Sequence, residues 1–150
     1  MRTILIIPNL KYEHNLYNAI RSGEAFGITE VWIPYGKKLS KIFPQGARKA
    51  YKHIKINRFK TDEEVANYLV KEKIKPICIE NSKDSVSILN FNFPADIALI
   101  MGHENLGVSP FYTLKYKSVR IPQFGVMNCL NTYVAMSIIM YERFKQGLKV

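Results

Sequence analysis

Short apolar runs alternate with amphipathic stretches along the whole chain, and this alternation constrains the possible folds more than any other feature. The runs have the length and composition of buried strands, and they lie at Thr3–Ile7, Val31–Ile33, Ile77–Glu80, Ile97–Met101 and Val119–Ile121. Strands that alternate with helices are typical of α/β domains with a mostly parallel sheet. The 150 residues have the size of one domain and contain no repeat or linker, so we expect a single domain over residues 1–150.

Two of the amphipathic stretches have the periodicity of helices that would cover such a sheet. Over Asn15–Gly27 the apolar residues fall within one arc of the helical wheel, and polar residues, Arg21 among them, fall on the opposite side. Further along, Thr61 and Glu64 have the spacing of a capping box, which predicts the start of a second helix. Pro76 is expected to end that helix, because a proline disfavours helical geometry in the residue before it.

The last predicted helix, from about Asn131 to Gln146, is apolar nearly all round. Between Tyr133 and Tyr141 only Ser137 is polar. A helix without a polar face must be covered on both sides. We therefore expect a second subunit, and hence a homodimer.

The charge of the chain is strongly positive and is concentrated in one segment. Lys and Arg number 22 against 12 Asp and Glu, which gives a formal net charge of +10. Most of this excess lies between Lys37 and Lys60, where there is no acidic residue. A phosphate backbone is the natural partner of such a segment, although a merely solvated surface is the alternative. The residues that we expect to bind RNA are Lys37, Lys38, Lys41, Arg48, Lys49, Lys52 and Lys55.

Several classes of protein lack their characteristic features in this sequence. Cys78 and Cys129 lie far apart with no CxxC motif, so we expect neither a disulfide scaffold nor a metal site. No apolar run approaches the roughly 18 residues of a membrane span, and the chain begins on a strand rather than a charged leader, so we expect a cytoplasmic protein that does not engage membranes. A flavodoxin-like nucleotide-binding protein is an alternative that has no phosphate-binding loop to support it.

Three polar clusters stand where a predicted strand ends or a helix begins, and open α/β sheets bind their ligands at the carboxyl ends of strands. The clusters are His14–Ser22, Met101–Pro110 and Ile121–Asn131. Each also has a purely structural interpretation, as a solvated helix face, as a glycine turn, and as a loop in which Asn131 only caps the next helix. A glycine turn, however, does not require the His-Glu-Asn sequence that follows Gly102.

Taken together, the clusters resemble the motifs of the TrmH (SpoU) family of RNA ribose 2′-O-methyltransferases, within the SPOUT superfamily. Asn15 and Arg21 followed by Glu24–Gly27 resemble the first motif, Gly102–Ser109 the second and Ile121–Asn131 the third. The resemblance covers nearly the whole chain. It implies an α/β fold in which helices flank a mostly parallel sheet and the C-terminal part forms a deep trefoil knot. It also implies a homodimer that binds S-adenosylmethionine in the knot.

The resemblance further implies roles for individual residues. By position in the motifs, the catalytic-site residues would be Asn15, Arg21, Glu104 and Asn131. The cofactor-binding residues would be Ile79, Glu80, Met101, Gly102, His103, Gly107, Ile121, Gln123, Cys129 and Leu130. Cys129 stands where the family usually has serine, so a weak thiol hydrogen bond replaces a hydroxyl one. We further expect a single domain without the N- or C-terminal RNA-binding extensions of larger members, so the basic segment would have to bind more of the RNA.

The sequence therefore predicts an S-adenosylmethionine-dependent RNA 2′-O-ribose methyltransferase, with tRNA as the expected substrate and guanosine 18 as a candidate position by resemblance. Ribosomal RNA and the tRNA wobble nucleotide stay open as substrates. The alternative is a catalytically inactive RNA-binding protein of the same fold, for which Cys129 is the best argument. Because a guanidinium is a very poor base, we expect Arg21 to clamp a phosphate and polarise the hydroxyl. Glu104 and His103 both stay open as proton acceptors.

Overall fold

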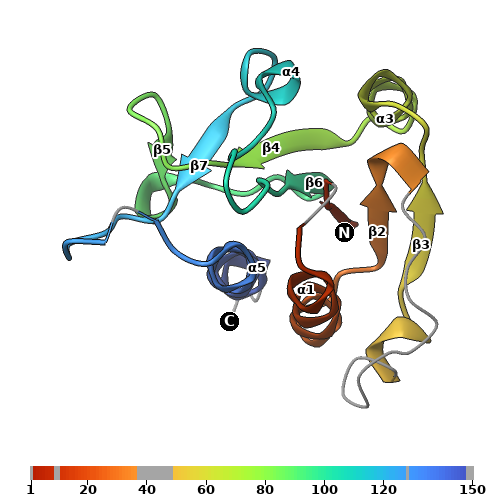
Figure 1. Ribbon diagram of the computed structural model, residues 1–150, viewed down its shortest axis with the longest axis horizontal. Coiled ribbons are helices and arrows are strands. Elements are labelled where there is room, and N and C mark those ends of the chain that lie inside the picture. The colour runs from red at the N-terminus through yellow and green to blue at the C-terminus, as the bar shows by residue number, and fades with distance from the viewer. Residues whose placement is uncertain (1, 9–10, 37–48, 128, 148–150) are drawn as a thin grey trace.

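The computed structural model describes residues 2–8, 11–36, 49–127 and 129–147, and a seven-stranded sheet lies at its centre (Figure 1). Every pairing within this sheet is parallel, and the strand order is β3-β2-β1-β6-β4-β7-β5. The α/β class and the parallel sheet that the sequence predicts are confirmed. The strands are β1 (Thr3–Ile6), β2 (Glu30–Ile33), β3 (Lys55–Arg58), β4 (Lys75–Ile79), β5 (Val86–Ser87), β6 (Ile97–Ile100) and β7 (Ser118–Arg120).

Helices cover both faces of the sheet, and they are α1 (Glu13–Ala25), α3 (Asp62–Lys71), α4 (Pro110–Thr113) and α5 (Thr132–Gly147). Figure 1 shows α1 and α5 on one face and α3 and α4 on the other. Two cores result: Leu5, Leu99 and Met136 are fully buried in the first, and Ile6 and Leu69 in the second. Short 3-10 helices, η1 (Pro34–Gly36) and η2 (Ile88–Asn90), follow β2 and β5.

The two edge strands are elements that the sequence patterns do not predict. β3 forms one edge of the sheet and pairs along its whole length with β2, and β5 forms the other edge with only two residues. β3 lies within the basic segment, and Ile56 is its only apolar residue. An edge strand this short and polar has too little apolar alternation to be recognised from sequence.

The expectation that Pro76 ends the second helix is wrong. α3 ends at Lys71, and Lys73 adopts a positive φ of 55° shortly after it. The N–H groups of Lys73 and Ile74 donate to carbonyls in the last turn of α3, at 3.1 and 3.0 Å. These two bonds are the pattern of a Schellman motif, so the left-handed residue ends the helix.

Pro76 lies inside β4 instead, where it pairs with Ala98 of β6. The N–H of Cys78 donates toward β7, and side-to-side alternation points the nitrogen of Pro76 toward the same neighbour. The pairing of β4 with β7 begins only at Cys78. The missing N–H of the proline therefore costs the sheet no hydrogen bond, which explains why it is tolerated here.

The α5 helix is covered on one side only within the single chain. Met136, Ile139 and Met140 are buried in the first core, whereas Ile138 and Tyr141 are 39% and 52% exposed. Apolar surface of this helix thus stays exposed in the single chain. The homodimer and the trefoil knot stay predictions.

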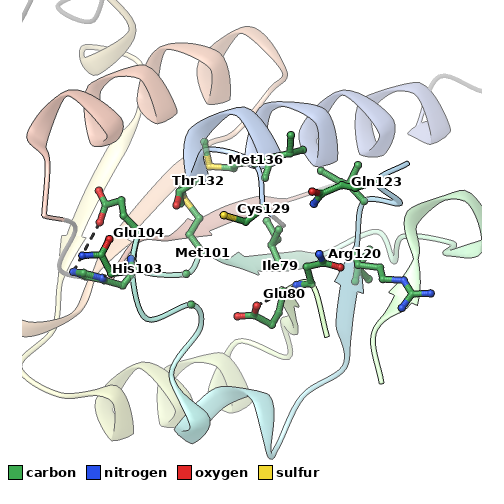
Figure 2. A pocket seen from close by; sticks show the side chains of 18 residues that line it. Ile79, Glu80, Met101, His103, Glu104, Arg120, Gln123, Cys129, Thr132 and Met136 are labelled. Carbon is green, nitrogen blue, oxygen red and sulfur yellow. Dashed lines mark hydrogen bonds and ion pairs between the residues drawn. The ribbon is translucent and has the colours of Figure 1, made fainter. Parts of the chain in front are cut away.

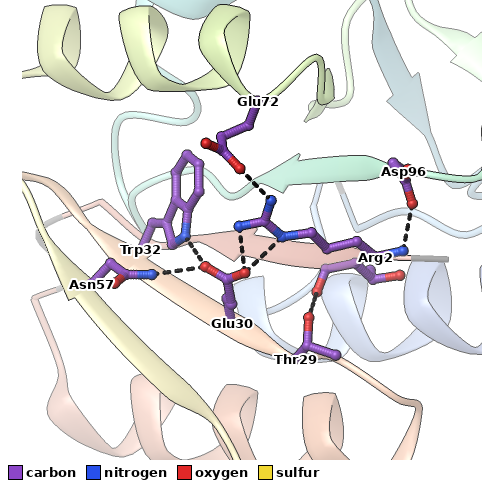
Figure 3. A network of polar contacts seen from close by, with 8 residues as sticks. Arg2, Thr29, Glu30, Trp32, Asn57, Glu72 and Asp96 are labelled. Atoms are coloured by element: carbon purple, nitrogen blue, oxygen red, sulfur yellow. Dashed lines mark hydrogen bonds and ion pairs between the residues drawn. The ribbon is translucent and has the colours of Figure 1, made fainter.

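A network of charged and polar side chains connects several elements at the end of the sheet where the strands begin (Figure 3). Arg2 Nε donates to Glu30 Oε1 at 2.7 Å, and Arg2 Nη1 donates to Glu72 Oε2 at 2.9 Å. The other oxygen of Glu30 accepts hydrogen bonds from the Trp32 indole at 2.9 Å and from the Asn57 amide at 2.8 Å. Burial alone would raise the pKa of Glu30, but the bonds from Trp32 and Arg2 hold it below its ordinary value.

Candidate functional site

An open pocket lies where β4, β6 and β7 end, beside the first turns of α5 (Figure 2). Its walls combine apolar and polar side chains, with Glu104 and His103 on one side and Arg120 pointing outward on the other. Every residue that the resemblance assigns to the cofactor lines this one pocket: Ile79, Glu80, Met101, Gly102, His103, Gly107, Ile121, Gln123, Cys129 and Leu130. Three segments far apart in sequence therefore converge on a single site.

The loop from Gly102 to Val108 forms one wall of the pocket and is closed on itself. The backbones of His103 and Gly107 exchange two hydrogen bonds, at 2.9 and 3.0 Å. A Cβ at Gly102 would lie 2.8 Å from the carbonyl carbon of Gly107, and Gly107 itself has a φ of 70°. A Cβ at Gly107 would also lie 2.6 Å from Glu80 Oε2. The close approach and the left-handed backbone together explain the two glycines of this motif.

Two carboxylates hold this loop from opposite sides. Glu80 follows β4, and its Oε2 accepts the backbone N–H of Val108 at 2.7 Å. Glu104 reaches toward α1, where Oε2 accepts the backbone N–H of Lys11 at 2.9 Å and Oε1 accepts the Asn15 amide at 2.7 Å. The Asn15–Glu104 bond joins the first and second sequence motifs directly.

Asn15 is only 1% exposed, so the interpretation of this cluster as a solvated helix face does not hold for Asn15. Its Nδ2 donates to Glu104, and its Oδ1 has no hydrogen-bond partner among the described residues. Burial alone would raise the pKa of Glu104, but the Lys11 N–H and the Asn15 amide outweigh it and hold that pKa below its ordinary value. Glu104 is therefore an ionised carboxylate and a weak proton acceptor.

His103 is engaged through both of its ring nitrogens. Nδ1 accepts the backbone N–H of Asn105 at 3.2 Å, and Nε2 lies 3.9 Å from Glu104 Oε2. The N–H of Asn105 therefore occupies the Nδ1 lone pair, which His103 would need in order to act as a general base.

Arg21 and Asn131 lie outside the lining of the pocket in the single chain. Arg21 is exposed on α1. Asn131 is also exposed, and its Oδ1 accepts the backbone N–H of Tyr133 at 3.0 Å, so it does cap α5 as the structural interpretation predicts. Of the predicted catalytic residues, the structure thus brings Asn15 and Glu104 together and leaves Arg21 and Asn131 apart from them.

Comparison with known proteins agrees with this geometry. The model of the SpoU rRNA Methylase family matches residues 2–141. The chain belongs to this family. The SPOUT and TrmH resemblance of the sequence is thereby confirmed.

Two relatives within the SpoU family show the range of assigned activities. The chain is 26% identical over 149 residues to a Staphylococcus aureus protein assigned to the TrmH family of tRNA/rRNA methyltransferases, covering 97% of this chain and 60% of the relative. It is also 26% identical over 145 residues to the tRNA (guanosine(18)-2′-O)-methyltransferase of Aquifex aeolicus, covering 95% of this chain and 69% of that protein. The chain therefore spans about 60% of the length of the relative from S. aureus.

Solved SpoU structures have the same fold. The A. aeolicus TrmH/SpoU tRNA modifying enzyme superposes with a TM-score of 0.86 at 27% identity, covering 96% of this chain and 74% of the other. The SpoU methyltransferase AviRb from Streptomyces viridochromogenes, solved in complex with the cofactor AdoMet, superposes with a TM-score of 0.84 at 21% identity. That match covers 97% of this chain and 58% of AviRb.

Several residues that line the pocket are not predicted by the sequence motifs. They are neighbours of assigned residues, such as Arg120 before Ile121, or they lie in the first turns of α5. The sequence could have indicated them, because residues next to a motif residue leave the same strand end and enter the same pocket. The missed residues are Asn81, Asn105, Val119, Arg120, Thr132, Ala135 and Met136.

The predicted RNA-binding residues divide into two groups. Lys37, Lys38, Lys41 and Arg48 fall outside the described residues. Lys49, Lys52 and Lys55 are exposed. Lys55 begins β3, so it stands at the opposite end of the parallel sheet from the pocket. Their role in RNA binding stays a prediction.

No helix in the described part of the chain has both the length and the apolar character needed to span a membrane. Within the same residues, His, Cys, Asp and Glu side chains form no group of three or more that could hold a metal ion. Cys78 is buried and Cys129 is exposed, and neither forms a disulfide.

Proposed function

We propose that this protein is an S-adenosylmethionine-dependent methyltransferase that modifies a ribose 2′-hydroxyl of RNA, with tRNA as the substrate and guanosine 18 as the first position to test. The observation that carries the proposal is the convergence of the second and third motifs on one pocket, with Asn15 of the first motif bonded to Glu104 at its margin. Membership of the SpoU family and the relatives named for tRNA and rRNA methylation support it.

The chemistry of the pocket fits this cofactor. Ile79, Met101 and Ile121 supply apolar walls of the kind that an adenine ring needs. The carboxylates of Glu80 and Glu104 stand at the margin and favour a positively charged ligand group. When bound, S-adenosylmethionine supplies a methyl group activated by its positively charged sulfur.

The residues of this chain then orient the substrate rather than form covalent bonds with it. Glu104 holds the loop against α1 and fixes the Asn15 amide through its Nδ2 group. Asn15 Oδ1 is itself buried, with no partner among the described residues, so Asn15 positions Glu104 rather than contacting the ribose hydroxyl. Arg21 binds the adjacent phosphate and polarises the same hydroxyl. Because the lone pair of His103 Nδ1 is used and the pKa of Glu104 is low, we assign proton removal to neither.

The active form that we propose is a homodimer with the knotted fold of the family. Ile138 and Tyr141 leave apolar surface on α5 uncovered. Arg21 lies on α1 beside α5 and does not line its own chain's pocket. A second copy packed on this face would cover the apolar surface and could bring its Arg21 to the pocket.

The proposed reaction is tested by methyl transfer from labelled cofactor to bulk tRNA and to ribosomal RNA. Nucleosides from the digested RNA are then identified by mass spectrometry. We expect 2′-O-methylnucleosides in tRNA and their loss in Asn15→Ala. Cofactor and RNA binding without any methylated nucleoside would instead support the inactive RNA-binding alternative.

The shared site is tested by mixing two variants that we expect to be inactive, Arg21→Ala and Asn131→Ala, with Asn131 assigned to the pocket of its own chain. If Arg21 serves the pocket of the other copy, a mixed dimer has one doubly damaged site and one intact site. Subunit exchange, verified by mass, should then restore up to about half of the parent activity per mixed dimer. Confirmed exchange with no recovery would show that Arg21 serves its own chain.

A further inference from the structure

A buried aspartate at the start of α3 holds two tyrosines from different parts of the chain. Asp62 is 8% exposed. Its Oδ1 accepts the hydroxyl of Tyr112, from α4, and its Oδ2 accepts the hydroxyl of Tyr35, from η1, both at 2.5 Å. Tyr112 is buried, and its role is structural. Tyr35 differs, because its hydroxyl is held while the residue as a whole remains 58% exposed.

The backbone of Tyr35 is also unusual. Its φ of 63° lies in the left-handed region, which costs energy for a residue with a side chain. The hydrogen bond to Asp62 raises the pKa of Tyr35 to about 12, with smaller contributions from burial and from the charges of Asp62 and Glu63. The ring is therefore fixed by a strained backbone at one end and by a neutral, hydrogen-bonded hydroxyl at the other, and a large apolar ring remains open to solvent.

The surroundings of Tyr35 suit a nucleic acid base better than a phosphate. The N–H of Phe59 donates to the carbonyl of Ile33 at 3.1 Å, so the segment with Arg58 and Lys60 runs beside the end of β2. Arg58 and Lys60 are exposed cations that suit phosphates. Glu63 lies close enough to act on Tyr35 electrostatically and disfavours an anion directly on the ring. An uncharged base is the group that such a ring can stack on.

We propose that Tyr35 is a stacking platform for a base of the RNA substrate, held in place by Asp62. This inference rests on the proposed function, and it names a contact of the same substrate outside the pocket. Ring stacking contributes more when the ring is fixed beforehand, because less side-chain freedom is lost on binding.

Tyr35 stands at the end of the sheet where the pocket lies. η1 directly follows β2, so Tyr35 stands at the same end of the parallel sheet as the pocket, and Figure 1 shows the end of β2 close to α3. β2 is two strands away from β6, whose end lines the pocket. The ends of these two strands are therefore about 10 Å apart across the sheet.

The test compares the affinity of bulk tRNA and of ribosomal RNA for the wild type, Tyr35→Leu and Tyr35→Phe over a range of salt concentrations. Tyr35→Leu should weaken binding by about 5- to 100-fold. The slope of log affinity against log salt should stay unchanged, because no phosphate contact is removed. Tyr35→Phe keeps the ring but loses the bond to Asp62, so its loss of RNA affinity should be smaller than that of Tyr35→Leu.

Tyr68→Leu is the matched control, since Tyr68 is a partly exposed tyrosine on α3 that packs against Trp32 and Phe59.

A fluorescent variant gives an independent readout. Trp32 is the only tryptophan and is fully buried, so Tyr35→Trp adds an exposed reporter, and its emission should be quenched by tRNA. If the wild type binds RNA and Tyr35→Leu binds it equally well, the stacking proposal is overturned while the proposed function stands. If the wild type binds neither RNA, both fall. Melting curves and cofactor titrations of each variant verify that fold and pocket are intact.

Discussion

The two ends of the parallel sheet use their charged side chains in different ways. Where the strands begin, Arg2 and Glu30 bond to each other and to neighbouring side chains, and Glu30 is almost fully enclosed. Where the strands end, Glu80 and Glu104 bond chiefly to backbone N–H groups of loops and line an open pocket. The same residue type thus stabilises the fold at one end and shapes a binding site at the other. Substitutions at the two ends should therefore separate stability from ligand binding.

The largest effect is expected from Gly102→Ala at the pocket end. The added Cβ would meet backbone atoms at 2.8 and 2.9 Å, so the loop itself must shift. Calorimetry should show S-adenosylmethionine affinity reduced by about 100-fold, which is about 2.7 kcal/mol. Gly27→Ala is the control, because Gly27 has a φ of 80° but nothing within 4 Å of its added Cβ. Gly27→Ala should lose about 1 kcal/mol of stability and no affinity for S-adenosylmethionine. Equal losses of cofactor affinity in the two variants would contradict the distinction between the two ends of the sheet.

At the other end, Glu30→Gln should destabilise the fold and leave the pocket unchanged. The substitution removes the charge that faces Arg2 and weakens a buried network, at a cost of about 2 kcal/mol in the free energy of unfolding. Urea denaturation measures this loss. Glu80→Gln is the matched variant at the pocket end, where the unfolding free energy should change by less and cofactor affinity by more. The opposite ranking would show that the roles of the two carboxylates are reversed.

The stability difference between the wild type and Glu30→Gln should depend on pH. The pKa of Glu30 is lowered in the folded state, so its contribution is fully present above the ordinary value of 4.5 and is lost as pH falls through the folded-state value. Unfolding curves of the two proteins should therefore converge below about pH 4.5. A constant difference from pH 7 down to pH 3 would mean that the charge of Glu30 contributes nothing.

The smallest effect is expected for Cys129→Ser. Cys129 is exposed within the pocket lining, and the substitution restores the residue that is usual in the family with little change in volume. Methyl transfer should equal or exceed that of the parent. A loss of more than tenfold, about 1.4 kcal/mol of transition-state stabilisation, would assign the thiol a role of its own.

The sequence is sufficient to predict those parts of the site that are local along the chain. Gly102, His103 and Glu104 are consecutive after an apolar strand, so their placement at its carboxyl end follows from the alternation of strands and helices. The burial of Asn15 could not be predicted, because a helical wheel treats the helix alone and Glu104 reaches it from 89 positions away. The bonds of Asp62 to Tyr35 and Tyr112 span 27 and 50 positions and leave no periodic signal either.

The edges of the fold are less predictable for a related reason. β3 and β5 pair on one side only, so they need little of the apolar alternation that marks the central strands. The end of α3 is set by the left-handed backbone of Lys73, which a search for glycine or proline does not find. Local rules therefore predict the centre of the sheet, and tertiary contacts decide its margins.

Hydrogen–deuterium exchange with and without saturating S-adenosylmethionine tests most directly the claim that the ligand binds only where the strands end. Peptides covering residues 79–81, 101–107 and 119–123 should exchange more slowly with the cofactor present, because most of their residues line the pocket. Peptides covering residues 27–30 and 72–75, at the Arg2–Glu30 end, should exchange at the same rate in both conditions. Protection at that end, or no protection anywhere at saturating cofactor, would contradict the account.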